Sequence, residues 1–247
     1  MNGTIIALTA RQLFGQKRTL FIALLMVIPI FFALLYRLNS EQADPQHWVA
    51  NVLFVRVLVG SLLPFVALIF GTAALGTEFE DGTAVYLLSK PVARWKVLAS
   101  KLIVAWAATA VFVVITSLIS APLALQGSGV SGGSMIAGFV IAEVVAAFVY
   151  CAIFLALSIL TAHALIAGLI YVFVWEAVLT SLFSGLRYLS VREYAIALAQ
   201  WIGNIPDSVL DAHIRGVTAL ILLAVIGVGA VWLGVRWLVR WQIGETA

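Results

Sequence analysis

The sequence predicts an all-α membrane protein with six transmembrane helices, an N-terminal interfacial helix and both termini in the cytoplasm. Of its 247 residues, 64% are hydrophobic and only 10% are charged, whereas a soluble domain carries about 25% charged residues. The mean hydropathy is +1.13, and the apolar residues form long runs instead of the short alternating segments of a membrane β-barrel. Because so few polar side chains remain to cover a water-facing surface, most of the chain must face lipid.

Six apolar runs are long enough to cross a bilayer, which takes about 20 residues. We place the spans near 19–36, 48–75, 102–125, 135–160, 164–183 and 217–238. The fourth and fifth spans belong to one tract of about 49 residues, which would measure roughly 73 Å as a straight helix. The chain must therefore fold back, and we place the turn at Thr161-Ala162-His163.

The positions of lysine and arginine predict the orientation. With the N-terminus inside, four basic residues face outward: Arg37, Arg187, Arg192 and Arg215. Nine face the cytoplasm: Arg11, Lys17, Arg18, Lys90, Arg94, Lys96, Lys101, Arg236 and Arg240. This asymmetry favours both termini in the cytoplasm of a multi-pass protein of the cell (cytoplasmic) membrane.

The remaining segments fit a single transmembrane domain over residues 1–247. Residues 1–18 carry apolar side chains at helical spacing, which predicts an interfacial helix; an unstructured basic tail is the alternative. Residues 184–216 form a long outer segment that Pro206 interrupts. We expect a pair of short interfacial or re-entrant helices there.

Between the second and third spans, residues 76–101 read GTEFEDGTAVYLLSKPVARWKVLASK and are predicted to be cytoplasmic. The segment begins with the acids Glu78, Glu80 and Asp81, continues through an apolar stretch and becomes basic around Pro91. Proline biases the residue before it away from helix. We expect a short amphipathic element across the membrane face, available to a cytoplasmic partner; an ordinary solvated loop is the alternative.

This segment resembles the signature of ABC-2-type transporter permeases: an E-x-E-x-G-T start, a leucine pair, P-x-x-R, and a lysine that leads into the third span. The matching residues are Glu78, Glu80, Gly82, Thr83, Leu87, Leu88, Pro91, Arg94 and Lys101. The interfacial start, the six spans and the long outer segment agree with that family along the chain. The family's shape implies that the outer segment 184–216 forms a gate; a lid with no transport role is the alternative. The resemblance implies the permease subunit of an ATP-driven exporter, in which residues 76–101 couple to a separate ATPase.

The chain has no complete phosphate-binding loop. The nearest match, at 127–134, has glycine where the phosphate-binding lysine would stand, and it reads as a flexible linker. We therefore expect no enzyme activity and no cofactor bound by this chain, with ATP and Mg²⁺ in a partner. The resemblance implies two ATPase subunits and a second permease copy or paralogue; no nucleic-acid partner is expected, and the substrate is not indicated.

Three charged residues fall inside predicted spans, namely Arg56, Glu143 and Glu176. Both carboxylates lie roughly 10–12 Å below the outer boundary at 1.5 Å per residue. We hypothesise that Arg56 pairs with one or both of them near the outer mouth of the pathway. Intramembrane charges are candidates for substrate or ion contacts; the alternative is a structural ion pair, or protonated carboxyls bonded to neighbouring helices.

Two other functions remain open. Glu143 and Glu176 are candidates for the relay of an ion-coupled secondary transporter, and the chain is also compatible with a non-transporting membrane scaffold. Neither alternative requires the E-x-E-x-G-T segment. The three histidines are far apart, so we expect no metal site. Small residues on one face of the last span, Gly227, Ala230 and Gly234, predict close helix contact.

Overall fold

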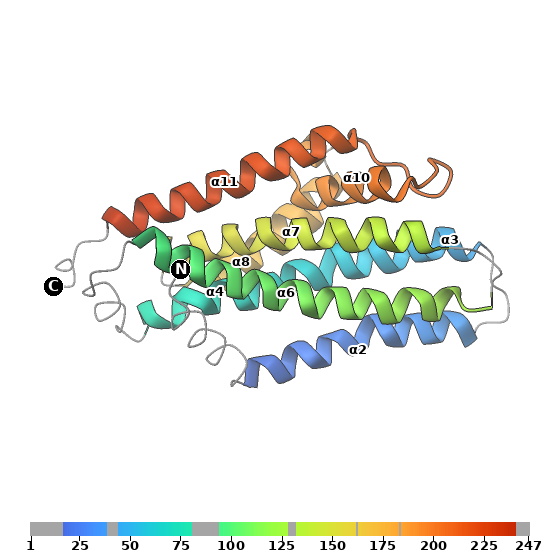
Figure 1. Ribbon diagram of the computed structural model, residues 1–247, viewed down its shortest axis with the longest axis horizontal. Coiled ribbons are helices and arrows are strands. Elements are labelled where there is room, and N and C mark those ends of the chain that lie inside the picture. The colour runs from blue at the N-terminus through green and yellow to red at the C-terminus, as the bar shows by residue number, and fades with distance from the viewer. Residues whose placement is uncertain are drawn as a thin grey trace.

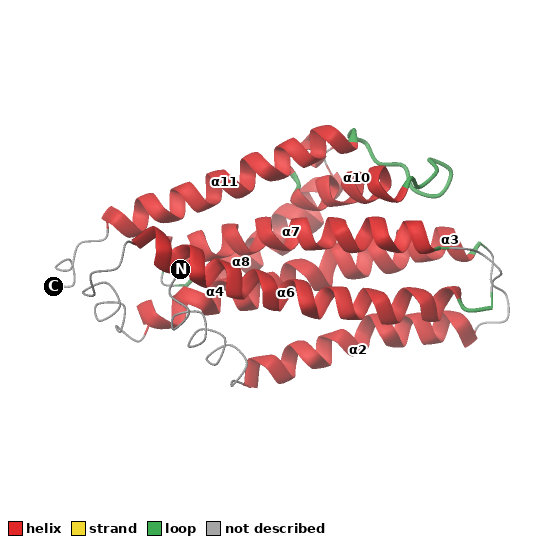
Figure 2. Cartoon of the chain, in the orientation of Figure 1, coloured by secondary structure: helices red, strands yellow, loops and turns green. Residues whose placement is uncertain are grey.

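The structure is a computed structural model that describes residues 17–38, 44–80, 94–127, 132–161, 163–182 and 184–240. Within these ranges the chain forms helices joined by turns and loops, and no strand occurs in them. Figure 2 shows this arrangement, with a long described loop connecting α10 to α11. The predicted all-α class is confirmed.

Five helices in the described part of the chain are long and apolar enough to cross a membrane. They are Leu20–Leu38, Pro45–Gly76, Arg94–Leu125, Gly133–Leu160 and Gly216–Val239. The predicted fifth span corresponds to a shorter apolar helix, Ala164–Glu176. A multi-pass membrane protein is therefore supported, while the count of six spans stays a prediction.

The helices form one elongated bundle with α7 near its centre (Figure 1). Figure 1 places the start of α2, the end of α4, the start of α6 and the end of α11 at one end, which we call the coupling end. The opposite end, which we call the outer end, contains α3 and α10. The elements are α2 (Lys17–Leu38), α3 (Pro45–Trp48), η1 (Val49–Leu62), α4 (Leu63–Glu80), α6 (Arg94–Leu125), α7 (Gly133–Leu160), α8 (Ala164–Ile170), η2 (Tyr171–Leu179), α9 (Thr180–Leu182), η3 (Ser184–Leu189), α10 (Val191–Gly203) and α11 (Gly216–Arg240).

The predicted fold-back between the fourth and fifth spans is confirmed. Helix α7 ends at Leu160, and the backbone of the next residue, Thr161, is extended with φ −138° and ψ 139°. The amide of His163 donates a hydrogen bond to the Thr161 hydroxyl at 3.2 Å, and α8 begins at Ala164. A side chain that bonds a nearby amide gives the backbone an alternative to helix, which explains why the turn falls here.

Apolar side chains cover much of the outside of the bundle, whereas polar side chains lie within it. Large apolar residues are exposed along α2, α8, η2 and α11. Buried hydroxyls instead line the inner side of α6, where Thr109, Thr116 and Ser120 each donate to the carbonyl four residues earlier. This distribution suits a protein whose surroundings are lipid or another apolar chain.

Helix α10 packs against α7 with almost no side chain between the two backbones. A Cβ atom at Gly138 would lie 2.6 Å from the carbonyl oxygen of Ala199 and 2.6 Å from the Cα of Gly203. Only glycine allows this approach. The close contact predicted for the last span is also found, since a Cβ at Gly234 would lie 3.1 Å from Leu98 of α6.

Candidate functional site

The motif that follows the second span is divided between helices and residues that the structure does not describe. Helix α4 extends to Glu80, so Glu78 and Glu80 lie in its last turn. The six central positions lie outside the described residues: Asp81, Gly82, Thr83, Leu87, Leu88 and Pro91. The predicted interfacial helix at 1–18 also lies outside them, except that α2 begins at Lys17.

The helix of the third span begins at Arg94, eight residues before the predicted start at 102. Residues 94–101 therefore belong to α6 and not to a separate connecting segment. The reason is that Val97, Leu98 and Leu102 are buried against the bundle, at a spacing that keeps them on one side of a helix. Proline 91 stands before this start, and no helix breaker follows it in residues 94–101.

Arg94 joins the start of α6 to the end of α11. Its Nη1 donates to the carbonyl oxygen of Leu238 at 2.5 Å and to that of Val239 at 2.9 Å. The last carbonyls of a helix have no intrahelical donor and carry the negative end of the helix dipole. Arg94 supplies hydrogen-bond donors to these last carbonyls and places a positive charge beside the negative end of the α11 dipole.

Lys101 joins α6 to α4 in the same part of the bundle. Its side chain is 1% exposed, and its Nζ donates to the carbonyl oxygen of Ala74 at 2.6 Å. Because a buried ammonium is costly unless it is bonded, this contact fixes the two helices relative to each other. Together, Arg94 and Lys101 hold α4, α6 and α11 at the coupling end.

Glu143 is buried between α6 and α7. The hydroxyl of Ser117 donates to its Oε2 at 2.7 Å, whereas its Oε1 is buried without a hydrogen-bond partner in the described residues. The carboxyl is 0% exposed. A buried polar atom left without a partner is unfavourable for folding alone, which makes Glu143 a candidate for a functional contact.

Glu176 is buried as well, but its carboxyl has several donors. Tyr171 Oη donates to Oε1 at 3.1 Å, Ser190 Oγ donates to Oε2 at 3.1 Å, and the amide of Val191 donates to Oε1 at 3.2 Å. These contacts connect η2 with the start of α10. Ser117 and Tyr171 were not predicted as partners of these carboxyls, because neither residue stands in a recognisable motif.

The predicted pairing of Arg56 with Glu143 or Glu176 is not found in the structure. Arg56 is exposed, and the donors to both carboxylates are the residues just named. The reason is that η1 is a π-helix, in which hydrogen bonds connect residues five apart. Arg56 and Ser61 consequently share the exposed side, and Ser61 Oγ donates to the carbonyl of Arg56 at 3.0 Å.

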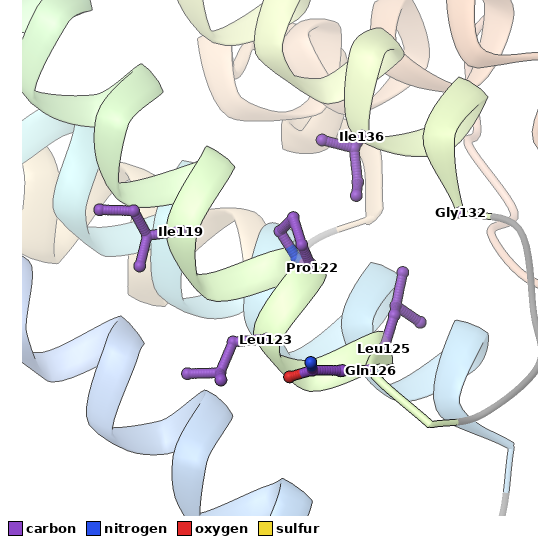
Figure 3. A pocket seen from close by; sticks show the side chains of 7 residues that line it. All are labelled: Ile119, Pro122, Leu123, Leu125, Gln126, Gly132 and Ile136. Carbon is purple, nitrogen blue, oxygen red and sulfur yellow. The ribbon is translucent and has the colours of Figure 1, made fainter.

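A groove lies between the end of α6 and the start of α7, with a volume of about 530 Å³. Figure 3 shows Pro122 of α6 and Ile136 of α7 among its walls. Its other lining residues are Ile119, Leu123, Leu125, Gln126 and Gly132. Gln126 accepts a hydrogen bond from Arg37 of α2 at 2.6 Å. Glu143 lies two turns along α7 from Ile136, about 10 Å away.

Membrane-length helices with apolar outer faces and buried polar groups define a polytopic membrane protein, and a buried carboxyl such as Glu143 is a candidate for a functional contact within it. Residues 4–226 match the family described as ABC-2 family transporter protein, and the chain belongs to this family. The resemblance seen in residues 76–101 is thereby confirmed. No curated protein matches the chain.

Membership of this family gives the chain a general role. ABC-2 family members are membrane transport subunits that lack a nucleotide-binding domain and associate with ATPase subunits in ABC transporters. The chain is therefore an ABC-transporter permease.

Proposed function

We propose that this chain is the permease half of an ATP-driven exporter that moves a substrate out across the cytoplasmic membrane. The observation that carries the proposal is the family match over residues 4–226. The distribution of basic residues supports the orientation: Arg94, Lys96, Lys101 and Arg236 belong to parts of α6 and α11 near the coupling end. On this proposal the coupling end faces the cytoplasm.

The motif residues are proposed to receive the movement of the ATPase. Glu78, Glu80, Asp81, Gly82, Thr83, Leu87, Leu88 and Pro91 form the docking part of the segment. Arg94 and Lys101 pass its displacement into the bundle, because each is hydrogen-bonded to a different helix. A bonded, packed junction transmits displacement better than a flexible connection does.

The assembly is proposed to contain two ATPase subunits, in which ATP and Mg²⁺ act, and a second permease copy or paralogue. The exposed apolar surface of α2 supports this arrangement in part. Only 17% of its span is buried within the chain, so the rest of that helix is free to face lipid or another permease.

A second candidate, ion-coupled transport, is favoured by one observation. Glu143 has a buried oxygen without a partner in the described part of the chain, and such a carboxyl is suited to contact an ion or a polar group of a substrate. Glu176 is less suited to a relay, because its oxygens already accept three hydrogen bonds.

Co-purification tests the proposed partnership. The chain is expected to retain an ATPase with a Walker motif, and replacing Glu80 and Gly82 together with lysine and proline is expected to release it. Asp211→Lys is the matched control, because Asp211 is an exposed acid in the loop between α10 and α11. Equal retention by both variants would contradict the docking role.

Chemical labelling of an introduced cysteine tests which end of the bundle faces the cytoplasm. A cysteine introduced at Ser89 in a Cys151→Ala background is expected to react with a membrane-impermeant maleimide only after the cytoplasmic side is exposed. The native Cys151 is fully buried, so its removal serves to exclude background labelling. Labelling of intact cells at position 89 would overturn the exporter proposal.

A further inference from the structure

The outer segment is connected to the fifth apolar helix through the carboxyl of Glu176. Glu176 lies in η2, and two of its three donors, Ser190 and the amide of Val191, stand at the start of α10. The third donor, Tyr171, lies in η2 itself. One buried side chain therefore bonds two separate elements.

The start of α10 is built to receive this carboxyl. Ser190 is its N-cap residue, and the Ser190 hydroxyl accepts a hydrogen bond from the amide of Glu193 at 3.4 Å while donating to Glu176. The amide of Val191 is one of the first amides of the helix, which have no intrahelical acceptor. A carboxylate placed here also complements the positive end of the helix dipole.

Other polar groups surround the same turn of α10. The side chain of Arg192 approaches η1, since a Cβ at Gly60 would lie 3.2 Å from its Nε. That Nε is buried without a hydrogen-bond partner in the described residues, and the buried side chain of Tyr150 on α7 interacts with Glu176. The first turn of α10 thus lies among α7, η1 and η2, and Glu176 makes the hydrogen bonds that fix it to η2.

The far end of α10 is fixed to a different helix. Gly203 packs directly on Gly138 of α7, so α10 bridges α7 and η2 at the outer end. The chain passes from α7 to α8 between Leu160 and Ala164, twelve residues before Glu176. Two further hydrogen bonds lie in this region, from Trp175 to the carbonyl of Leu189 at 3.5 Å and from Arg187 to the carbonyl of Thr180 at 3.3 Å. Glu176 supplies the buried hydrogen bonds between η2 and the start of α10.

We propose that Glu176 is a positioning residue that anchors the first turn of α10 to η2, so that the outer segment moves together with the fifth apolar helix and not as a separately hinged lid. For its consequence in transport this inference rests on the proposed function. A displacement of residues 164–182 would then be carried to the outer surface by α10. The anchor itself does not depend on the identity of the substrate or of the ATPase.

Hydrogen–deuterium exchange of the full chain in lipid nanodiscs tests the anchor. In Glu176→Leu, the amides of residues 188–194 are expected to exchange about tenfold faster, because three hydrogen bonds to a carboxyl are lost. Amides of 104–114 in α6, a helix from which no donor to Glu176 comes in the described residues, are expected to keep their exchange rates. Glu143→Leu removes the other buried carboxyl and is the matched control, with no change expected in 188–194.

Milder variants keep the test decisive if Glu176→Leu fails to fold. Glu176→Gln retains one acceptor and is expected to give an intermediate rate, as is Ser190→Ala. Ser190→Thr keeps the hydroxyl and is expected to restore the slow exchange that Ser190→Ala loses. Unchanged exchange at 188–194 in both Glu176→Gln and Ser190→Ala would overturn the anchor.

A functional readout separates the anchor from the proposed transport role. In nanodiscs with the co-purified ATPase, Ser190→Ala is expected to lower the stimulation of ATP hydrolysis by the permease at unchanged complex yield, and Ser190→Thr to restore it. Faster exchange with full stimulation would show an anchor without a role in the cycle and would overturn that part of the inference. If no ATPase co-purifies, the proposed function fails, while the exchange result still decides the anchor.

Discussion

Glu143 and Glu176 lie at a similar predicted depth in neighbouring spans, and both are buried, yet their surroundings differ. Glu176 accepts hydrogen bonds from three donors on two elements. Glu143 accepts one, from Ser117, and its second oxygen has no partner in the described residues. The comparison shows that residue type and depth do not distinguish these two intramembrane acids, whereas their hydrogen-bond donors do. Glu176 is built into the architecture, whereas Glu143 retains an unused acceptor.

The largest effect is expected from Glu176→Leu. The substitution leaves the buried hydroxyl of Tyr171 and the amide of Val191 without their acceptor, at a cost of about 2–5 kcal/mol. We expect a strong loss of folded protein after detergent extraction, measured by size-exclusion chromatography and thermal unfolding. Glu143→Leu is expected to lose much less, since Ser117 can turn to a backbone carbonyl as Ser120 does. Equal losses would break the distinction between the two acids.

Lys101→Met is expected to have an intermediate effect. The side chain is buried and donates to the carbonyl of Ala74, and methionine keeps the length of the side chain without the charge. Loss of a charged hydrogen bond costs about 1–3 kcal/mol. The expected result is a lower unfolding temperature together with weaker ATPase stimulation. Lys96→Met is the control, because Lys96 is an exposed lysine five residues earlier in the same helix; a similar loss in that variant would contradict the role of burial.

Glu143→Gln is expected to preserve folding and to change transport. The amide keeps the shape of the side chain and an oxygen that can accept from Ser117, so the free energy of unfolding should change by no more than about 1 kcal/mol. Transport, measured in proteoliposomes with the partner ATPase, should fall severalfold if the free oxygen contacts the substrate. Unchanged transport at normal abundance would remove Glu143 from the pathway and leave it a structural residue.

Arg56→Gln is expected to have the smallest effect on folding. Its side chain is exposed and donates to neither carboxylate, so its removal should change stability by no more than about 0.5 kcal/mol. Abundance in the membrane and thermal unfolding are the measurements. A destabilisation as large as that of Glu176→Leu would show that Arg56 is paired with an acid after all.

Many helices of the bundle were predicted directly from the apolar runs of the sequence. The predicted span at 135–160 corresponds to α7 at Gly133–Leu160, and the turn at 161–163 falls where predicted. The exposure of Arg56 was not predicted, because the π-helix in which it lies arranges its side chains differently from an ordinary helix. The start of α10 carried a readable signal, since Ser190 and Glu193 have the spacing of a capping box.

The sequence by itself determined that the chain crosses a membrane, and its E-x-E-x-G-T segment indicated the family. These properties depend on composition, on run length and on a local motif, none of which requires knowledge of distant contacts. Only the tertiary structure decided that Lys101 bonds α4, that Arg94 bonds α11, and that Glu176 holds α10. Each of these contacts joins residues on separate helices, and their distances depend on how the helices pack, which the periodicity of a single helix does not fix.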